Sequence, residues 1–128
     1  MAMKKIVVVD DDETIRKTFF LLLHKKFKIY LAKDAREALQ RFRRSAIDLI
    51  ITDVKLPDMT GLEMVAEFRK VGNNVPVVLI SAYPDLIKLE ELEKLKIGYF
   101  FVKPLDLEAI TRSINYILIP PEARALSF

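Results

Sequence analysis

Cysteine is absent from this sequence of 128 residues, and histidine occurs only once, as His24. The lack of cysteine excludes disulfide bonds, thiol catalysis and zinc–thiolate centres, and it fits a reducing compartment. One histidine cannot build a histidine-based metal cluster. Glycine and proline are scarce, with 3 and 6 residues, whereas 52% of the residues are hydrophobic. This composition predicts a packed globular domain and argues against a disordered chain.

Long apolar runs and a strong charge of either sign are missing as well. No apolar segment approaches the length that crosses a membrane, and the opening MAMKK is not followed by the apolar region of a signal peptide. The net charge is +3, from 21 basic and 18 acidic residues, so charge alone neither requires nor excludes a nucleic-acid partner. The length fits one domain, and we expect no membrane partner.

Five short apolar runs are spaced along the chain, at residues 6–9, 28–32, 49–52, 77–81 and 100–102. Continuous runs of this length are typical of strands that are covered on both faces of a parallel sheet. Apolar residues at helical spacing follow each run, over residues 14–25, 34–42, 62–71, 84–95 and 104–117. In the first of these helices we expect Ile15, Phe19, Leu22 and Leu23 to face the core.

Strand and helix therefore alternate five times along the chain. This order predicts an α/β domain with a doubly wound five-stranded parallel sheet and five helices on its two faces. We expect the domain to span residues 1–119, with residues 120–128 as a tail or linker stub. Asp34 and Asp12 are predicted to cap the helices that follow them, and Pro84 is predicted to open the fourth helix.

Acidic side chains collect where two of the predicted strands end. Asp10 and Asp11 follow the first strand and Asp53 follows the third. Ligand sites of open parallel sheets lie beyond the carboxyl ends of the strands, so these carboxylates can converge. Such a cluster is unfavourable unless it is protonated or holds a cation. A hard divalent ion such as Mg²⁺, which prefers oxygen ligands, is the natural occupant.

A cation and a hydroxyl follow the remaining strands at the same edge. Lys103 stands between the apolar fifth strand and Pro104, and Ser81 ends the fourth strand. A lysine is a good point-charge partner for phosphate. Metal, carboxylate, lysine and hydroxyl together are typical of phosphoryl transfer, with a carboxylate able to form an aspartyl phosphate.

Four segments resemble the receiver domain of bacterial two-component response regulators, the CheY-like family. They read IVVVDDD, LIITDVKLPDMTGLEM, VVLISAY and YFFVKP, and the resemblance covers residues 4–119. It implies a flavodoxin-like sheet with strand order 2-1-3-4-5. It also implies a phosphoacceptor switch of a two-component system or phosphorelay, which is a regulatory domain and not an enzyme, in the cytoplasm of a bacterium.

The resemblance implies a role for each acidic residue at the edge. Asp53 matches the phosphoacceptor. Asp10 and Asp11 match the acidic pair that, with Asp53, holds Mg²⁺ or Mn²⁺, and the backbone carbonyl of Lys55 matches a further metal ligand. Asp12 is interpreted differently, as the cap or a first-turn acid of the following helix.

The resemblance also implies the switch residues. Ser81 matches the hydroxyl that shifts toward the phosphoryl group, and Lys103 matches the phosphate-contacting lysine, whose bond to the following proline is cis in the family. Phe100 stands at the aromatic switch position, which often carries tyrosine, so a hydrogen bond from that side chain to a partner is lost. Lys55 and Tyr83 match positions that tune hydrolysis of the phosphoryl group.

Partners follow from the same resemblance. Phe20 and Leu21 lie off the main apolar stripe of the first helix, where the family meets a histidine kinase or histidine phosphotransfer protein. The face of the fourth helix, fifth strand and fifth helix is expected to control an unknown output domain or effector. We expect a monomer or a phosphorylation-linked homodimer. Four arginines are interpreted as a solvated face and not as a nucleic-acid site, namely Arg36, Arg41, Arg43 and Arg44.

Three other functions remain as alternatives. A phosphatase of the haloacid-dehalogenase type needs an acid/base aspartate two residues after its nucleophile, and that place here is Lys55. A flavodoxin-like FMN binder needs a glycine- and hydroxyl-rich loop after the first strand, where this chain has acids that repel phosphate. A pseudo-receiver keeps the fold without phosphorylation, and the complete set of acidic and basic positions argues against it.

Overall fold

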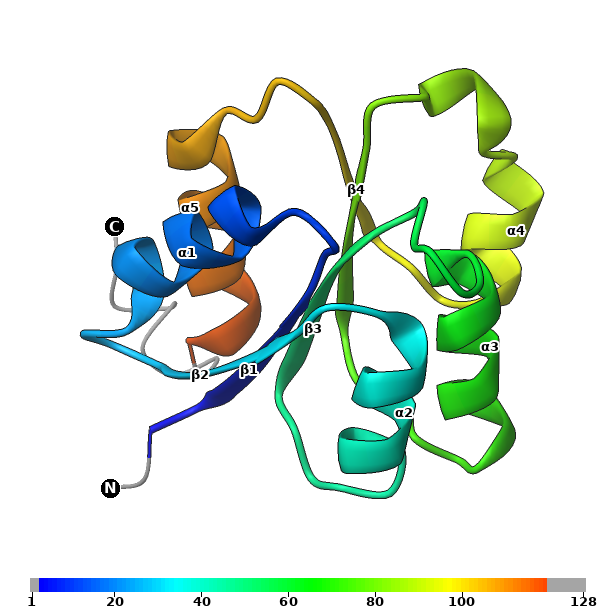
Figure 1. Cartoon of the computed structure of the whole chain (residues 1–128), viewed down its shortest axis with the longest axis horizontal. Coiled ribbons are helices and arrows are strands. Elements are labelled where there is room, and N and C mark those ends of the chain that lie inside the picture. The colour runs from blue at the N-terminus through cyan, green and yellow to red at the C-terminus, as the bar shows by residue number, and fades with distance from the viewer. Residues whose placement is uncertain (1–2, 120–128) are drawn as a thin grey trace.

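The computed structural model describes residues 3–119 of the chain, which form a parallel sheet with helices on both faces (Figure 1). The predicted tail at residues 120–128 lies outside the described residues. No helix in the described part is long and apolar enough to span a membrane. The elements are β1 (Lys5–Val9), α1 (Glu13–Leu23), β2 (Lys28–Ala32), α2 (Ala35–Phe42), β3 (Leu49–Asp53), α3 (Gly61–Lys70), β4 (Val77–Ser81), η1 (Pro84–Leu86), α4 (Leu89–Lys94), β5 (Tyr99–Val102) and α5 (Leu107–Leu118).

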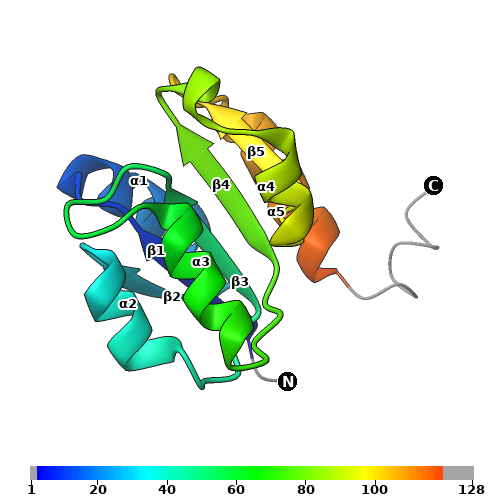
Figure 2. The same cartoon turned by 90° about the vertical axis from the view of Figure 1, so that its right-hand side faces the viewer.

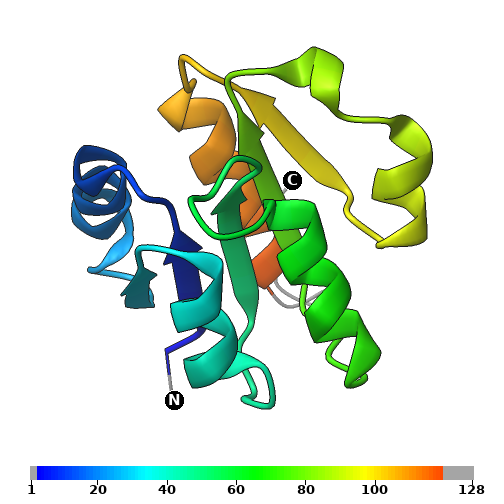
Figure 3. The same ribbon diagram turned by 45° about the vertical axis from the view of Figure 1, so that its right-hand side comes forward.

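The sheet has the order β2-β1-β3-β4-β5, and every neighbouring pair is parallel. This confirms the predicted fold class and the strand order 2-1-3-4-5. The chain moves outward in one direction from β1 to β2 and in the other from β3 to β5. All strand arrowheads point to one edge of the sheet, so the loops that follow the strands gather there (Figure 3). A ligand crevice is expected at this edge, between β1 and β3.

Two cores sandwich the sheet, which explains why the strands are continuously apolar. Helices α2, α3 and α4 cover one face, and α1 and α5 cover the other (Figures 1 and 2). In β1, Val7 and Val9 pack on the α2–α3 side, whereas Ile6 and Val8 pack on the α1–α5 side. Neighbouring residues of the strand therefore belong to different cores, and both sets must be apolar.

Helix α1 begins as predicted but ends earlier and buries a narrower face. The Asp12 carboxylate accepts a hydrogen bond from the N–H of Thr14 at 2.8 Å, which confirms Asp12 as the N-cap. The helix ends at Leu23 and not near residue 25. Leu22, expected in the core, is 40% exposed, because the buried face is centred on Phe19 and Leu23.

The prediction of one continuous helix that begins at Pro84 is wrong. Pro84 opens only a 3₁₀ turn, and α4 begins separately at Leu89 after an extended segment at Ile87 and Lys88. Ile87 packs against the core on the α2–α3 side, which draws the backbone out of helical conformation. Leu86 and Leu89, which are among the apolar residues at helical spacing in the predicted segment 84–95, are 69% and 70% exposed.

The junction of β3 and α3 is tightly packed at Gly61. Its N–H donates to the carbonyl oxygen of Val54 at 2.7 Å. A Cβ atom at Gly61 would collide with the backbone carbonyl oxygen of Asp53. The helix is then fixed by a capping box, in which Thr60 and Glu63 each accept from the other's backbone N–H. The end of β3 and the start of α3 are therefore one rigid unit.

Replacing Gly61 by alanine tests this close approach. The added methyl group forces the Asp53 backbone and α3 apart, and we expect a loss of about 1–3 kcal/mol in the free energy of unfolding, measured by chemical denaturation. Gly98 is the matched control, because it is exposed and a Cβ atom there meets nothing within 4 Å. Gly98→Ala should change stability by no more than about 0.5 kcal/mol. Equal stability of the two variants would contradict the close approach.

Candidate functional site

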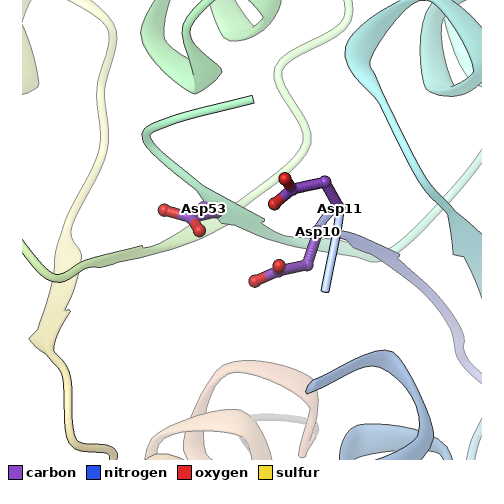
Figure 4. A group of neighbouring side chains, drawn as sticks. All are labelled: Asp10, Asp11 and Asp53. Atoms are coloured by element: carbon purple, nitrogen blue, oxygen red, sulfur yellow. The ribbon is translucent and has the colours of Figure 1, made fainter. Parts of the chain in front are cut away.

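Three carboxylates meet at the crevice between β1 and β3. Asp10 and Asp11 follow β1 and Asp53 is the last residue of β3, and their side chains gather at the strand ends (Figure 4). One oxygen from each lies within 4.8 Å of the other two. Asp10 is 1% exposed and Asp53 is 8% exposed, whereas Asp11 is open to solvent. The structure thus brings together the acids that the sequence predicted to converge.

Asp10 carries the clearest electrostatic strain in this cluster. Its Oδ1 accepts from the N–H of Asp12 at 2.9 Å, but its buried Oδ2 has no hydrogen-bond partner within the described residues. Burial raises the pKa of the Asp10 carboxyl, and the charges of Asp53 and Asp11 act in the same direction; the Asp12 N–H and Lys103 oppose this only in part. A buried, unpartnered carboxylate oxygen is costly unless a cation contacts it.

Lys103 supplies the positive charge. Its Nζ lies 2.9 Å from Asp53 Oδ2 and 3.6 Å from Asp10 Oδ2. Burial alone would lower the pKa of the Lys103 ammonium, but the hydrogen bond to Asp53 and the charge of Asp10 raise it overall. The bond from Lys103 to Pro104 is cis, as the resemblance implied. One ammonium faces three carboxylates, so the site retains negative charge that a divalent cation would balance.

The backbone around Asp53 is held by its neighbours. Asp53 Oδ1 accepts from the N–H of Lys55 at 3.2 Å, and its carbonyl oxygen accepts from the Thr52 hydroxyl at 2.9 Å. Ser81 ends β4 and is buried, and its Oγ accepts from the N–H of Tyr83 at 2.8 Å. Among the described residues, Ser81 makes no hydrogen bond to Asp53. The predicted hydroxyl is therefore beside the cluster but engaged elsewhere.

A hollow of about 240 Å³ that is open to solvent lies over Asp53. Lys55 and Tyr83 form part of its rim, and Asp11 and Lys103 also line it. The Lys55 Nζ is 5.4 Å from the centroid of the Tyr83 ring, within the range of a cation–π contact. Both side chains are exposed. The hollow gives Asp53 an approach from solvent, and this pair stands beside that approach.

The remaining predicted residues lie away from the acidic cluster. Phe100 is half-buried in β5 and packs on the α2–α3 side of the sheet. Phe20 is 40% exposed on α1, and its ring stacks on His24 with 4.9 Å between centroids. Arg41 is paired with Glu37 at 3.1 Å. The predicted solvated face holds three further arginines. Arg36 and Arg44 are exposed, whereas Arg43 is half-buried.

Sequence reasoning missed several side chains that hold the site in place. Besides Thr52, Arg16 donates from Nη1 to the Asp10 carbonyl oxygen at 2.6 Å. Asp58 binds the backbone at the start of α2 from the loop after β3. No pattern in the sequence marks these contacts: the Thr52 hydroxyl bonds the next residue within β3, whereas Arg16 and Asp58 reach other elements. The Thr60–Glu63 capping box, in contrast, has a recognisable sequence signature.

Comparison with known proteins identifies the family of this chain. The sequence model of the response regulator receiver domain matches residues 6–115. The sporulation initiation phosphotransferase F of Bacillus subtilis (strain 168) is 28% identical over 119 residues, which are 92% of this chain and 96% of that protein. The regulatory protein AtoC of Escherichia coli (strain K12) is 31% identical over 122 residues, which are 91% of this chain but only 26% of that protein.

Solved structures give the same result. The response regulator TrrA from Thermotoga maritima, crystallised in complex with Mg²⁺ and BeF, superimposes with a TM-score of 0.77 at 29% identity and covers 91% of this chain and 100% of that one. The chemotaxis response regulator CheY4 of Vibrio cholerae has a TM-score of 0.79 at 28% identity, with 91% and 100% covered. These matches show that the chain belongs to the response regulator receiver domain family, a family of regulatory domains.

Proposed function

We propose that Asp53 is the phosphoacceptor of this receiver domain. The observation that carries the proposal is the position of its carboxylate, which lies beside a solvent-accessible hollow, 2.9 Å from the Lys103 ammonium and next to Asp10 and Asp11. A carboxylate oxygen of Asp53 attacks phosphorus, and the bond from phosphorus to the donor breaks. The leaving group keeps the bonding electron pair, as the imidazole of a phosphohistidine or the carboxylate of acetyl phosphate does.

The residues at the edge fit a divalent cation of the Mg²⁺ type. Asp10, Asp11 and Asp53 offer oxygen ligands within 4.8 Å of one another, and the buried Asp10 Oδ2 lacks a hydrogen-bond partner within the described residues. We assign these carboxylates and the backbone carbonyl of Lys55 as the residues that would hold the ion. When bound, it would neutralise the negative charge that develops on the transferred group. Lys103 contributes a second positive charge there, and Ser81 offers a hydroxyl.

A catalytic phosphatase is the less favoured alternative. Turnover of an aspartyl phosphate needs an acid or base beside it, and the position two residues after Asp53 is occupied by Lys55. Lys55 and Tyr83 instead line the hollow over Asp53. We propose that their bulk restricts the access of water to the aspartyl phosphate. We therefore propose slow self-dephosphorylation. Sustained release of phosphate from generic phosphomonoesters would support the enzyme instead.

The proposed partners act on two surfaces. Phe20 and Leu21 of α1 are exposed and line an apolar hollow, which fits a helical phosphodonor such as a histidine kinase or histidine phosphotransfer domain. On the α4–β5–α5 face, Leu89 and Val102 are exposed, and half-buried Phe100 packs beneath. We propose that phosphorylation shifts Ser81 and Phe100 and changes this face for an output domain, in the bacterial cytoplasm.

Phosphorylation of Asp53 can be measured directly. Incubation with acetyl phosphate and Mg²⁺ should add one phosphoryl group to the wild-type protein, detected by intact mass. Asp53→Asn and metal-free samples should gain none, because the nucleophile or the charge balance is missing. A wild-type protein that stays unmodified with a range of phosphodonors would contradict the proposal and favour a pseudo-receiver.

Neighbouring Asp11 and Asp12 should behave differently in the same assay. Asp11→Ala removes a proposed metal ligand and should abolish Mg²⁺-dependent phosphorylation. Asp12→Ala removes the N-cap of α1, so it should cost about 1 kcal/mol of stability and leave phosphorylation largely intact. Equal loss of phosphorylation in both variants would show that the two acids do not have separate roles.

A further inference from the structure

We propose that Asp58 is a positioning residue for metal binding, which holds the loop after β3 by fastening it to the N-terminus of α2. The inference rests on the proposed function, because this loop carries the Lys55 carbonyl. It concerns residues 54–60, which connect the end of β3 to the start of α3. The contacts are those of a side chain that caps a helix to which it does not belong.

Asp58 binds α2 through both of its carboxylate oxygens. Oδ2 accepts from the N–H of Arg36 at 2.7 Å, and Oδ1 accepts from the N–H of Ala35 at 3.1 Å. Oδ1 also accepts from the N–H of Met59 at 3.1 Å. Partial desolvation acts to raise the pKa of the Asp58 carboxyl, but these backbone donors lower it overall. Ionised Asp58 is thus matched to free N–H groups in the first turn of a helix.

The loop is fixed at its base without help from Asp58. Lys55 and Thr60 face each other in an isolated antiparallel bridge, and Val54 accepts from Gly61 and donates to the carbonyl oxygen of Ile80 at 2.9 Å. Residues 56–59 lie beyond this base. In the described part of the chain, the hydrogen bonds from Asp58 to α2 are the only ones that join residues 56–59 to another element. Asp58 is therefore the one polar anchor of the loop tip.

Helix α2 has a cap of its own, which allows the two roles of Asp58 to be separated. Asp34 precedes the helix and accepts from the N–H of Glu37 at 2.8 Å. Loss of either carboxylate leaves α2 with unsatisfied N–H groups, but only loss of Asp58 removes the hydrogen bonds between the loop tip and α2. Lys55 is the residue at which the fixed base ends and the loop tip begins. A tip that moves independently of α2 therefore leaves the adjoining Lys55 carbonyl less pre-organised, and metal affinity depends on such outer contacts.

The experiment compares Asp58→Ala with Asp34→Ala in Mg²⁺ titrations followed by amide chemical shifts. Asp58→Ala should weaken Mg²⁺ binding about 10-fold relative to the wild type, as loss of an outer-shell contact does. Asp34→Ala should destabilise the fold to a similar degree and bind Mg²⁺ as the wild type does. Asp58→Asn keeps one acceptor oxygen, so its Mg²⁺ affinity should lie between those of the wild type and Asp58→Ala. If Asp58→Ala does not fold, the comparison is made with Asp58→Asn.

A second measurement needs no metal. Amide hydrogen exchange of the metal-free protein should become faster in residues 54–60 of Asp58→Ala and stay unchanged there in Asp34→Ala. Equal Mg²⁺ affinities and equal exchange in the two variants would overturn the positioning role. If the wild-type protein itself shows no Mg²⁺-dependent shifts, the proposed function fails instead, and faster loop exchange in Asp58→Ala would still show the anchor.

Discussion

The site depends on one ammonium group that lies against two buried carboxylates. Lys103 contacts Asp53 at 2.9 Å and Asp10 at 3.6 Å, while Asp11 adds a third negative charge from the solvent side. Buried like charges repel strongly, and a single lysine cannot neutralise all three. The described residues therefore leave the cluster with an excess of negative charge, and among them Asp10 Oδ2 has the Lys103 ion pair but no hydrogen-bond donor.

The fold keeps this unfavourable cluster together from several directions. Parallel strands deliver Asp10 and Asp53 to adjacent positions, and Thr52 and Arg16 each bind a backbone carbonyl of these aspartates. Gly61 lets α3 begin in contact with the Asp53 backbone. Two apolar cores, one on each face of the sheet, stabilise the strands that carry the acids. Stability from the cores therefore offsets the electrostatic cost at the edge.

Features that depend on local pattern were predictable from the sequence. The strands were found because each is covered on both faces, and the acids were placed at one edge because parallel strands end there. The Asp12 cap followed from its position before an amphipathic helix. The split of the fourth helix was not predictable, because its apolar spacing is helical and only packing of Ile87 reveals the break. Likewise, the contacts of Asp58 join two segments that are distant in the sequence and meet only in the folded chain.

The central claim is that Mg²⁺ completes the charge balance of a preformed site, and thermal unfolding with increasing Mg²⁺ tests it most directly. Ligand that binds only the native state stabilises it by about 2.7 kcal/mol at 100 times Kd, so the wild-type Tm should rise along a binding curve. Asp11→Ala should show no such rise, and NaCl at matched ionic strength should not reproduce it. Equal effects of Mg²⁺ and NaCl on the wild type, or an undiminished Mg²⁺ effect in Asp11→Ala, would contradict the account.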